Sequence, residues 1–321
     1  MIRSSYAFIN LVKAMCGVGV FALPVAFQQA GLWTGTVLAF ALGVVNAQSM
    51  TKLVKCSQYL GSRKETEKDI SKSDEAAVPM ISLSEKDTSK TDPEDNTTHS
   101  HTKSEGGGVE KRVALNYGNM AHEAFASKES ESLRNLAKPA KIFVNICIIG
   151  LQVGFCSSYY IFVVDHAKEA IDYLFSTEIS RDTLFFSVLP FFILIASVRS
   201  LAVLSWIGLL GNILVISSIV IIIGQMLFMD HIPLSQLPAF ASIEGATLAA
   251  GSIIYAYSAQ GVVLPLENKM KKPKDMLGPL GVISTSVAFI SVVYTTTGFL
   301  GYVTYGDKLK GSITLNLTNS P

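Results

Sequence analysis

Long stretches with almost no charged side chains are the feature that most restricts the fold of this chain. A helix needs roughly 20 apolar residues to cross a hydrocarbon core about 30 Å thick. The mean hydropathy of the 321 residues is +0.39, and only 16% of them are charged. The sequence therefore predicts an all-α polytopic membrane protein that lies in the lipid bilayer. Its seven predicted spans are Ser5–Ala30, Trp33–Cys56, Ile142–Val164, Leu184–Val198, Leu201–Met229, Ala246–Leu266 and Leu277–Val303.

The distribution of basic residues predicts the orientation of these spans. Lysine and arginine collect on the cytoplasmic side of membrane proteins. Four such residues lie near the span ends on one side, namely Lys168, Arg181, Lys308 and Lys310. The other side has many more, and we expect it and the N-terminus to be cytoplasmic: Lys52, Lys55, Arg63, Lys64, Arg134, Lys138, Lys141, Arg199, Lys269, Lys271, Lys272 and Lys274.

The net charge of the chain argues against nucleic acid as a partner. The 26 basic and 25 acidic residues give a net charge of +1. Binding to a phosphate backbone depends on an excess of lysine and arginine. We therefore expect no nucleic-acid partner.

One polar segment interrupts the apolar spans. Residues 62–110 are rich in Ser, Thr, Lys, Glu and Asp and contain the run Gly106–Gly108. Such a composition cannot bury enough apolar surface to offset the entropy of ordering the chain. It predicts a disordered cytoplasmic insert within a single transmembrane domain over 1–321. The segment Leu115–Phe125 that follows predicts a short helix along the inner membrane surface.

An odd number of spans places the C-terminal tail on the exterior side. Asn316, Leu317 and Thr318 form an N-glycosylation acceptor pattern in that tail. Asn316 is therefore a candidate glycosylation site.

The first span contains an interruption that points to a binding site. Gly17, Val18, Gly19 and Val20 precede Pro24, so two glycines and a proline fall within eight residues. Backbone groups freed inside a membrane are tolerated only where they line a cavity or are buried in protein. Free N–H groups at the start of a half-helix suit a carboxylate, as in transporters with broken helices.

The sixth span contains a second interruption. Tyr255, Tyr257, Ser258 and Ala259 stand among small and polar residues between Gly251 and Gly261. Broken spans one and six are the arrangement of an inverted repeat of five helices. Close helix packing is the alternative explanation, because small residues also let two helices approach.

Groups that could carry out a reaction are missing from the apolar spans. Asp165, Glu244 and Glu267 all lie at predicted span ends, and no grouping of a nucleophile with a base, and no metal-ligand set, is visible. The sequence predicts that the protein is not an enzyme and uses no cofactor or metal.

Several short strings carry a family resemblance that covers nearly the whole chain outside the polar insert. They are Asn10–Lys13, Gly17–Gly19, Ala22–Pro24, Ala30–Gly31, Leu53–Cys56, Leu151–Cys156, Gly261–Pro273, Gly301–Tyr302, Tyr305–Asp307 and Ser312–Leu317. On these strings the chain resembles the amino acid/auxin permease superfamily, and within it the proton-coupled amino-acid transporters. That branch has eleven spans, so the resemblance implies a chain truncated after the seventh. It also implies small amino acids as substrates, moved together with protons.

Two departures from that branch affect the expected mechanism. Gln48 stands where the resemblance implies a proton-sensing histidine, and an amide does not titrate. The segment Tyr257–Ala259 replaces a Phe-Glu-Gly string, which removes an acidic side chain. Amino-acid transport survives these changes better than proton coupling does.

The leading hypothesis is a secondary active, proton-coupled transporter of small amino acids. Gly17, Val18, Gly19 and Val20 would hold the substrate carboxylate, while Tyr255, Tyr257, Ser258 and Ala259 would surround the rest of the substrate. A membrane sensor on the same fold that binds an amino acid without moving it, or an inactive fragment, remains as an alternative. The sequence does not distinguish a location in the plasma membrane from one in the endolysosomal membrane.

Overall fold

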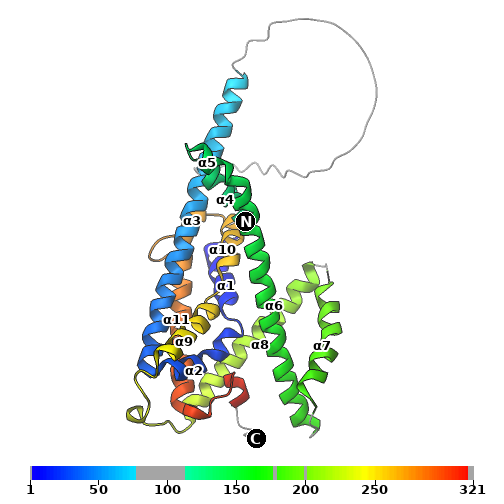
Figure 1. The fold of residues 1–321 in the computed structure, drawn as a ribbon, viewed down its shortest axis with the longest axis vertical. Coiled ribbons are helices and arrows are strands. Elements are labelled where there is room, and N and C mark those ends of the chain that lie inside the picture. Colours follow the sequence, from blue (N-terminus) through cyan, green and yellow to red (C-terminus); the bar gives the residue numbers. More distant parts are fainter. Residues whose placement is uncertain (1, 77–112, 176–178, 199–200, 317–321) are drawn as a thin grey trace, which may run out of the picture.

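The computed structural model of the chain is built from helices. It describes residues 2–76, 113–175, 179–198 and 201–316, and within these ranges the sole β-type pairing is an isolated bridge between Ile2 and Met270. The longer helices are α1 (Ser4–Met15), α2 (Gly19–Ala30), α3 (Leu32–Ala76), α4 (Tyr117–Ala126), α6 (Ala137–Phe175), α7 (Arg181–Ala196), α8 (Leu201–Phe228), α9 (Ile243–Ala256), α10 (Gln260–Lys269) and α11 (Val282–Tyr305). Figure 1 shows them as a bundle elongated along α3.

The predicted first span is broken, as the glycines indicated. Helices α1 and α2 meet at an angle of 56° across residues 16–18. Pro24 inside α2 has no N–H group, so the carbonyl of Val20 loses its helical partner. Gly301 of α11 packs directly on the ring of Pro24, where an added Cβ would lie 2.4 Å from the proline Cγ.

The predicted second span is the start of a much longer helix. α3 continues without interruption from Leu32 to Ala76 (Figure 1). The disorder predicted from residue 62 is therefore wrong for residues 62–76, while 77–110 lies outside the described residues. Lysine and glutamate are good helix formers, and Arg63 and Glu67 form an ion pair of 3.0 Å one turn apart. Local helix propensity thus extends the span where no apolar core is available.

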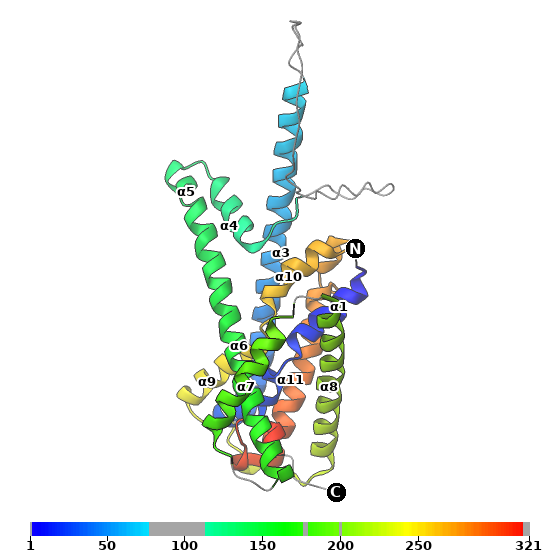
Figure 2. The ribbon, with the colours of Figure 1, turned by 90° about the vertical axis from the view of Figure 1, so that its right-hand side faces the viewer.

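The helix expected at Leu115–Phe125 is present as α4. It lies between α3 and the start of α6, next to the five-residue α5 (Glu131–Asn135), as Figure 2 shows. Gly118 allows the close approach to α6, because an added Cβ would lie 2.4 Å from the Asn145 Oδ1 atom. α4 is therefore packed against two long helices.

Not every predicted span passes a length and hydropathy test. Five helical segments in the described residues are long and apolar enough to cross a membrane, and the bent pair α1–α2 makes a sixth. The predicted fourth span forms α7, whose 16 residues extend about 24 Å at the usual helical rise. The structure thus supports a polytopic membrane fold without confirming the number of seven spans.

The buried core lies where α1, α2, α9 and α11 meet α3. Its largest fully buried side chains include Leu23, Phe27, Met50, Tyr257 and Tyr294. By contrast, the apolar residues of α6 and α8 are mostly exposed, with Phe143 at 67% and Ile221 at 58%. Large apolar side chains that face outward along whole helices fit a lipid environment.

Candidate functional site

The break in the first span leaves backbone amides free at the start of α2. The N–H of Gly17 donates to the Met15 carbonyl (2.7 Å), and those of Val20 and Phe21 donate to the carbonyls of Gly17 (3.3 Å) and Val18 (3.1 Å). The amides of Val18 and Gly19 donate to no group in the described part of the chain. These amides stand at the positive end of the α2 dipole, an arrangement that attracts an anion.

The second break lies in the predicted sixth span and follows the last turn of α9. The amides of Tyr257 and Ser258 still donate back to Ile253 and Tyr255, each at 3.1 Å, and α10 begins at Gln260. Asn46 of α3, which is 8% exposed, stabilises the gap: its Nδ2 donates to the Tyr257 carbonyl at 3.2 Å. The Nε2 of Gln260 donates in turn to the Asn46 Oδ1. Both expected interruptions are therefore present.

The first turn of α10 is opened by a side chain from α4. The Tyr117 hydroxyl donates to the Gln260 carbonyl, and it accepts from the Leu264 amide at 3.3 Å. These two backbone groups would normally bond to each other in a helix. A side chain inserted in this way bends or loosens the turn, and here it does so next to the second break.

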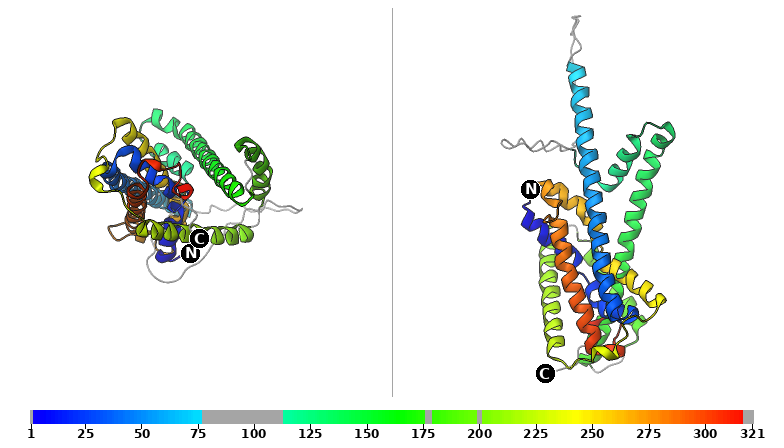
Figure 3. Two further views of the ribbon diagram at one scale, coloured as in Figure 1. Left: turned by 90° about the horizontal axis from the view of Figure 1, so that it is seen from below. Right: turned by 90° about the vertical axis from the view of Figure 1, so that its left-hand side faces the viewer.

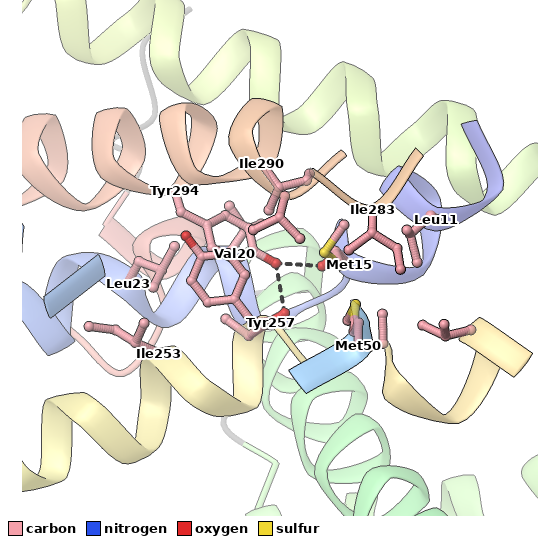
Figure 4. Close-up of a cluster of buried hydrophobic side chains, with 14 of the residues drawn as sticks. Leu11, Met15, Val20, Leu23, Met50, Ile253, Tyr257, Ile283, Ile290 and Tyr294 are labelled. Carbon is pink, nitrogen blue, oxygen red and sulfur yellow. Dashed lines mark hydrogen bonds between the residues drawn. The ribbon is translucent and has the colours of Figure 1, made fainter. Parts of the chain in front are cut away.

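The two breaks lie against each other. An added Cβ at Gly19 would lie 2.8 Å from the Ala256 Cα, so α2 and α9 touch through their backbones. The buried Tyr294 of α11 joins both breaks, since its hydroxyl lies 2.6 Å from the Met15 carbonyl oxygen and 2.7 Å from that of Ala256 (Figure 4). Carbonyl oxygens only accept, so the single hydroxyl proton is shared between the ends of α1 and α9.

One face of α6 runs along both breaks. Tyr159 lies beside Gly17, where an added Cβ would be 3.0 Å from the tyrosine oxygen. One turn away, the rings of Phe155 and Tyr255 lie 5.7 Å apart. The Tyr255 hydroxyl is buried and has no hydrogen-bond partner. An orphaned buried hydroxyl is costly in a folded protein, so its presence here points to a ligand or water that it would bind.

The remaining predicted residues of the second break have mainly structural contacts. Tyr257 is fully buried, and its hydroxyl is 2.7 Å from the Ser291 hydroxyl and 3.2 Å from the Ala39 carbonyl. Ser258 donates to the Ile254 carbonyl at 3.2 Å, and Ala259 is buried. Among the eight predicted substrate residues, Val18, Gly19 and Tyr255 therefore keep a polar group without a hydrogen-bond partner in the described part of the chain.

Two other predicted residues lie away from the breaks. Gln48 is exposed on α3 and lines a groove between α3 and α11. Asn316 ends the 3₁₀ helix η4 (Ile313–Asn316), and its amide nitrogen donates to the Lys308 carbonyl at 2.8 Å. Thr318, which completes the acceptor pattern, lies outside the described residues, so glycosylation stays a prediction.

Sequence reasoning missed the residues that other helices bring to the breaks. Asn46, Tyr117, Tyr159 and Tyr294 stand from 38 to 279 positions away from the break atoms they contact or approach. One signal was readable, because Gln152, Phe155 and Tyr159 repeat at the spacing of a single helical face. A polar and aromatic stripe in an otherwise apolar span indicates a face turned toward protein.

Comparisons with known proteins identify the family of the chain. The family model described as "transmembrane amino acid transporter protein" matches residues 2–73 and 98–321. A Caenorhabditis elegans protein named "probable amino acid transporter skat-1" is 28% identical over 99% of this chain and 59% of its own length. The Drosophila melanogaster "proton-coupled amino acid transporter-like protein pathetic" is 28% identical over 96% of this chain and 55% of its own length. No solved structure matches the chain.

These relatives are considerably longer than the chain, which spans somewhat more than half of their length. The family model covers most of the chain and describes transporters rather than enzymes, as the sequence predicted. With its apolar helices, the chain is an integral membrane protein. It belongs to the transmembrane amino acid transporter family.

Proposed function

We propose that the protein is a secondary active transporter of small amino acids that bind where the two broken spans meet. The observation that carries this proposal is the pair of free amides, Val18 and Gly19, placed directly beside the second break. They would donate to the substrate carboxylate at the positive end of the α2 dipole. The paired breaks also favour an inverted repeat of five helices as the architecture of the whole protein.

The other side of the site would receive the ammonium group and the side chain. The last turn of α9 ends at the break, and the negative end of its dipole favours a cation. The unpaired Tyr255 hydroxyl and the ring of Phe155 would lie against the substrate from the α6 side. Because Gly19 already touches Ala256, little room remains there, which supports a small substrate.

The names of the two relatives support amino-acid transport, and one of them includes coupling to protons. Uptake of labelled alanine, serine and glycine into proteoliposomes that contain the full-length protein tests the proposal. Saturable uptake driven by a gradient supports it. Saturable binding without uptake would contradict transport and favour the sensor instead.

Proton coupling would require a titratable group in the protein interior, since Gln48 cannot serve. Glu267 of α10 is fully buried, and its Oε1 accepts from the Gln58 Nε2 at 3.0 Å. Among the described residues it is the one buried carboxyl side chain. Buried ionisable groups inside membrane proteins commonly belong to proton pathways. Glu267 is therefore our candidate for the proton-carrying residue.

The variant Glu267→Gln is expected to abolish the increase of uptake with an inward proton gradient, because the amide keeps the size of the side chain but binds no proton. Exchange of labelled for unlabelled substrate should survive, since it requires no net proton movement. Glu244→Gln is the matched control, because Glu244 is exposed at the start of α9. Unchanged gradient dependence in Glu267→Gln would exclude this residue.

The orientation and location of the protein are also proposals. Lys269 and Lys271, two of the residues predicted to be cytoplasmic, meet the N-terminal segment at one end of the bundle, where Ile2 forms backbone hydrogen bonds with both (each 2.9 Å) and Ser4 donates to Asp275 at 2.6 Å. The opposite end, with η4, would then face the cell exterior or an endolysosomal lumen.

Glycosylation of Asn316 tests this topology: a glycosidase should increase the gel mobility of the protein, and Asn316→Gln should remove the shift. Absence of a shift in the parent protein would contradict the predicted glycosylation.

A further inference from the structure

A groove on the outside of the bundle is lined by apolar, neutral polar and basic side chains that have no part in the proposed transport site. α3 and α11 run side by side, as the right-hand view of Figure 3 shows in blue and orange. Between them lies a groove of about 600 Å³, here called the α3–α11 groove. From α3 it is lined by Phe40, Val44, Gln48, Thr51, Lys52 and Lys55, and from α11 by residues that include Ser284, Ala288 and Val292.

The polarity of the groove changes steadily along its length. Phe40 and Val44 are 46% and 57% exposed and give one end an apolar wall, with Val292 (58%) opposite. Gln48 and Thr51 follow, one turn further along the same face of α3. Lys52 and Lys55 then stand at the far end. The order is hydrocarbon, neutral hydrogen-bonding groups, then two cations.

Neither lysine has a partner for its charge among the described residues. Neither has a carboxylate within ion-pair distance in the part of the chain that the structure describes. Both are exposed at the end of the predicted membrane span. Their positive charges are therefore available to an anion at the membrane interface.

The dimensions of the groove match one leaflet of a bilayer. Lys52 and Phe40 are twelve residues apart on a continuous helix, and a helical rise of 1.5 Å per residue separates them by about 18 Å. Half of a hydrocarbon core is about 15 Å thick. A molecule with its charge at Lys52 and Lys55 would extend its tail to about the bilayer centre.

We propose that the α3–α11 groove binds an anionic phospholipid. The phosphate lies between the ammonium groups of Lys52 and Lys55, the amide of Gln48 donates to an ester carbonyl, and one acyl chain lies on Phe40, Val44 and Val292. A small anion dissolved in water would make no contact with the apolar end of the groove, and an uncharged lipid would gain nothing from the charges of the lysines. Charge complementarity thus favours an anionic lipid over either. Since the Ser291 hydroxyl that borders the groove is 2.7 Å from that of Tyr257, the bound lipid would lie one side chain from the second break.

Fluorescence quenching by brominated lipids tests this proposal on the full-length protein in vesicles. Val44→Trp places a reporter in the groove, and Trp33→Phe with Trp206→Phe removes the two tryptophans of this sequence. Any tryptophan of the full-length protein outside this sequence is replaced in the same way. Brominated phosphatidylserine is compared with brominated phosphatidylcholine at equal mole fractions in a phosphatidylcholine background. We expect phosphatidylserine to quench at a mole fraction about 25-fold lower, because each of the two lysines contributes about fivefold to the attraction of anionic lipid.

Charge variants separate a site from general attraction to the membrane surface. Lys52→Gln with Lys55→Gln should remove the preference, and Lys52→Arg with Lys55→Arg should keep it. Lys271→Gln with Lys272→Gln is the matched control, since these exposed residues have the same charge but lie outside the groove. Three results would overturn the proposal: equal quenching by both lipids, an equal loss of preference in the control pair, or no quenching by either lipid because a protein segment covers the groove.

Discussion

Replacing Tyr294 with phenylalanine is expected to reduce amino-acid uptake by about tenfold or more. The tyrosine hydroxyl is the direct polar link between the two breaks, at 2.6 Å from the Met15 carbonyl and 2.7 Å from that of Ala256. The phenylalanine ring fills the same space but leaves two buried carbonyl oxygens without their donor, a loss of about 1–3 kcal/mol. The ends of α1 and α9 would then no longer be held at a fixed distance, and the free amides of Val18 and Gly19 would lose their position.

Tyr302→Phe provides the matched control, because Tyr302 is a buried tyrosine of the same helix that contacts neither break. Uptake by both variants is compared at equal amounts of folded protein, measured by size-exclusion chromatography in detergent. Similar uptake by Tyr294→Phe and the parent protein would show that the link between the breaks is dispensable.

Replacing Gly19 with valine is expected to have the largest effect of any single change at the site. The Cβ would lie 2.8 Å from the Ala256 Cα, and a backbone atom cannot rotate away. Overpacking of this kind costs about 1–3 kcal/mol or more and moves the two helices apart. Substrate binding should be lost, and the thermal midpoint of the protein in detergent should fall as well.

Two further variants distinguish this explanation from a general sensitivity of membrane glycines. Gly251→Val is the control, since no atom lies within 4 Å of an added Cβ at this α9 position. Adding Ala256→Gly to Gly19→Val should not restore binding, because the contact is with the Cα, which every residue has. Restored binding in the double variant would mean that the helices do not touch through their backbones.

Features that depend on local sequence were predictable, and features that depend on distant packing were not. Both helix interruptions follow from neighbouring glycines, a proline and small residues, and both are present in the structure. The polar composition of residues 62–76 predicts disorder, but their lysines and glutamates favour a helix, and α3 extends to Ala76.

The partners of the breaks required the tertiary structure. Tyr294 is 279 positions from Met15, and Asn46 is 211 positions from Tyr257. The periodicity of a single segment does not predict contacts between residues so far apart in the sequence. The same limitation explains Tyr257: the sequence predicts it at the second break as a substrate residue, but its hydroxyl is directed to Ser291 and the Ala39 carbonyl. Position within an interruption does not determine the direction of a side chain.

The central claim is that the substrate lies at the joined breaks, and alkylation of Cys16 tests it most directly. Cys16 is a free, half-buried thiol at the end of α1, adjacent to Gly17. Cys56, Cys147 and Cys156 are exposed and can be replaced with alanine. With any cysteine of the full-length protein outside this sequence replaced as well, a neutral maleimide reports on Cys16 alone. The rate of alkylation is measured with and without alanine, serine or glycine.

A chain that keeps only Cys147 is the control, because this exposed α6 residue lies outside both breaks. If the substrate binds at the breaks, it should slow alkylation of Cys16 by about tenfold at ten times its dissociation constant. Half-maximal protection should occur at the concentration that half-saturates binding, and Cys147 should be unaffected. Unchanged alkylation of Cys16 at a substrate concentration that saturates uptake would contradict the placement of the substrate at the breaks.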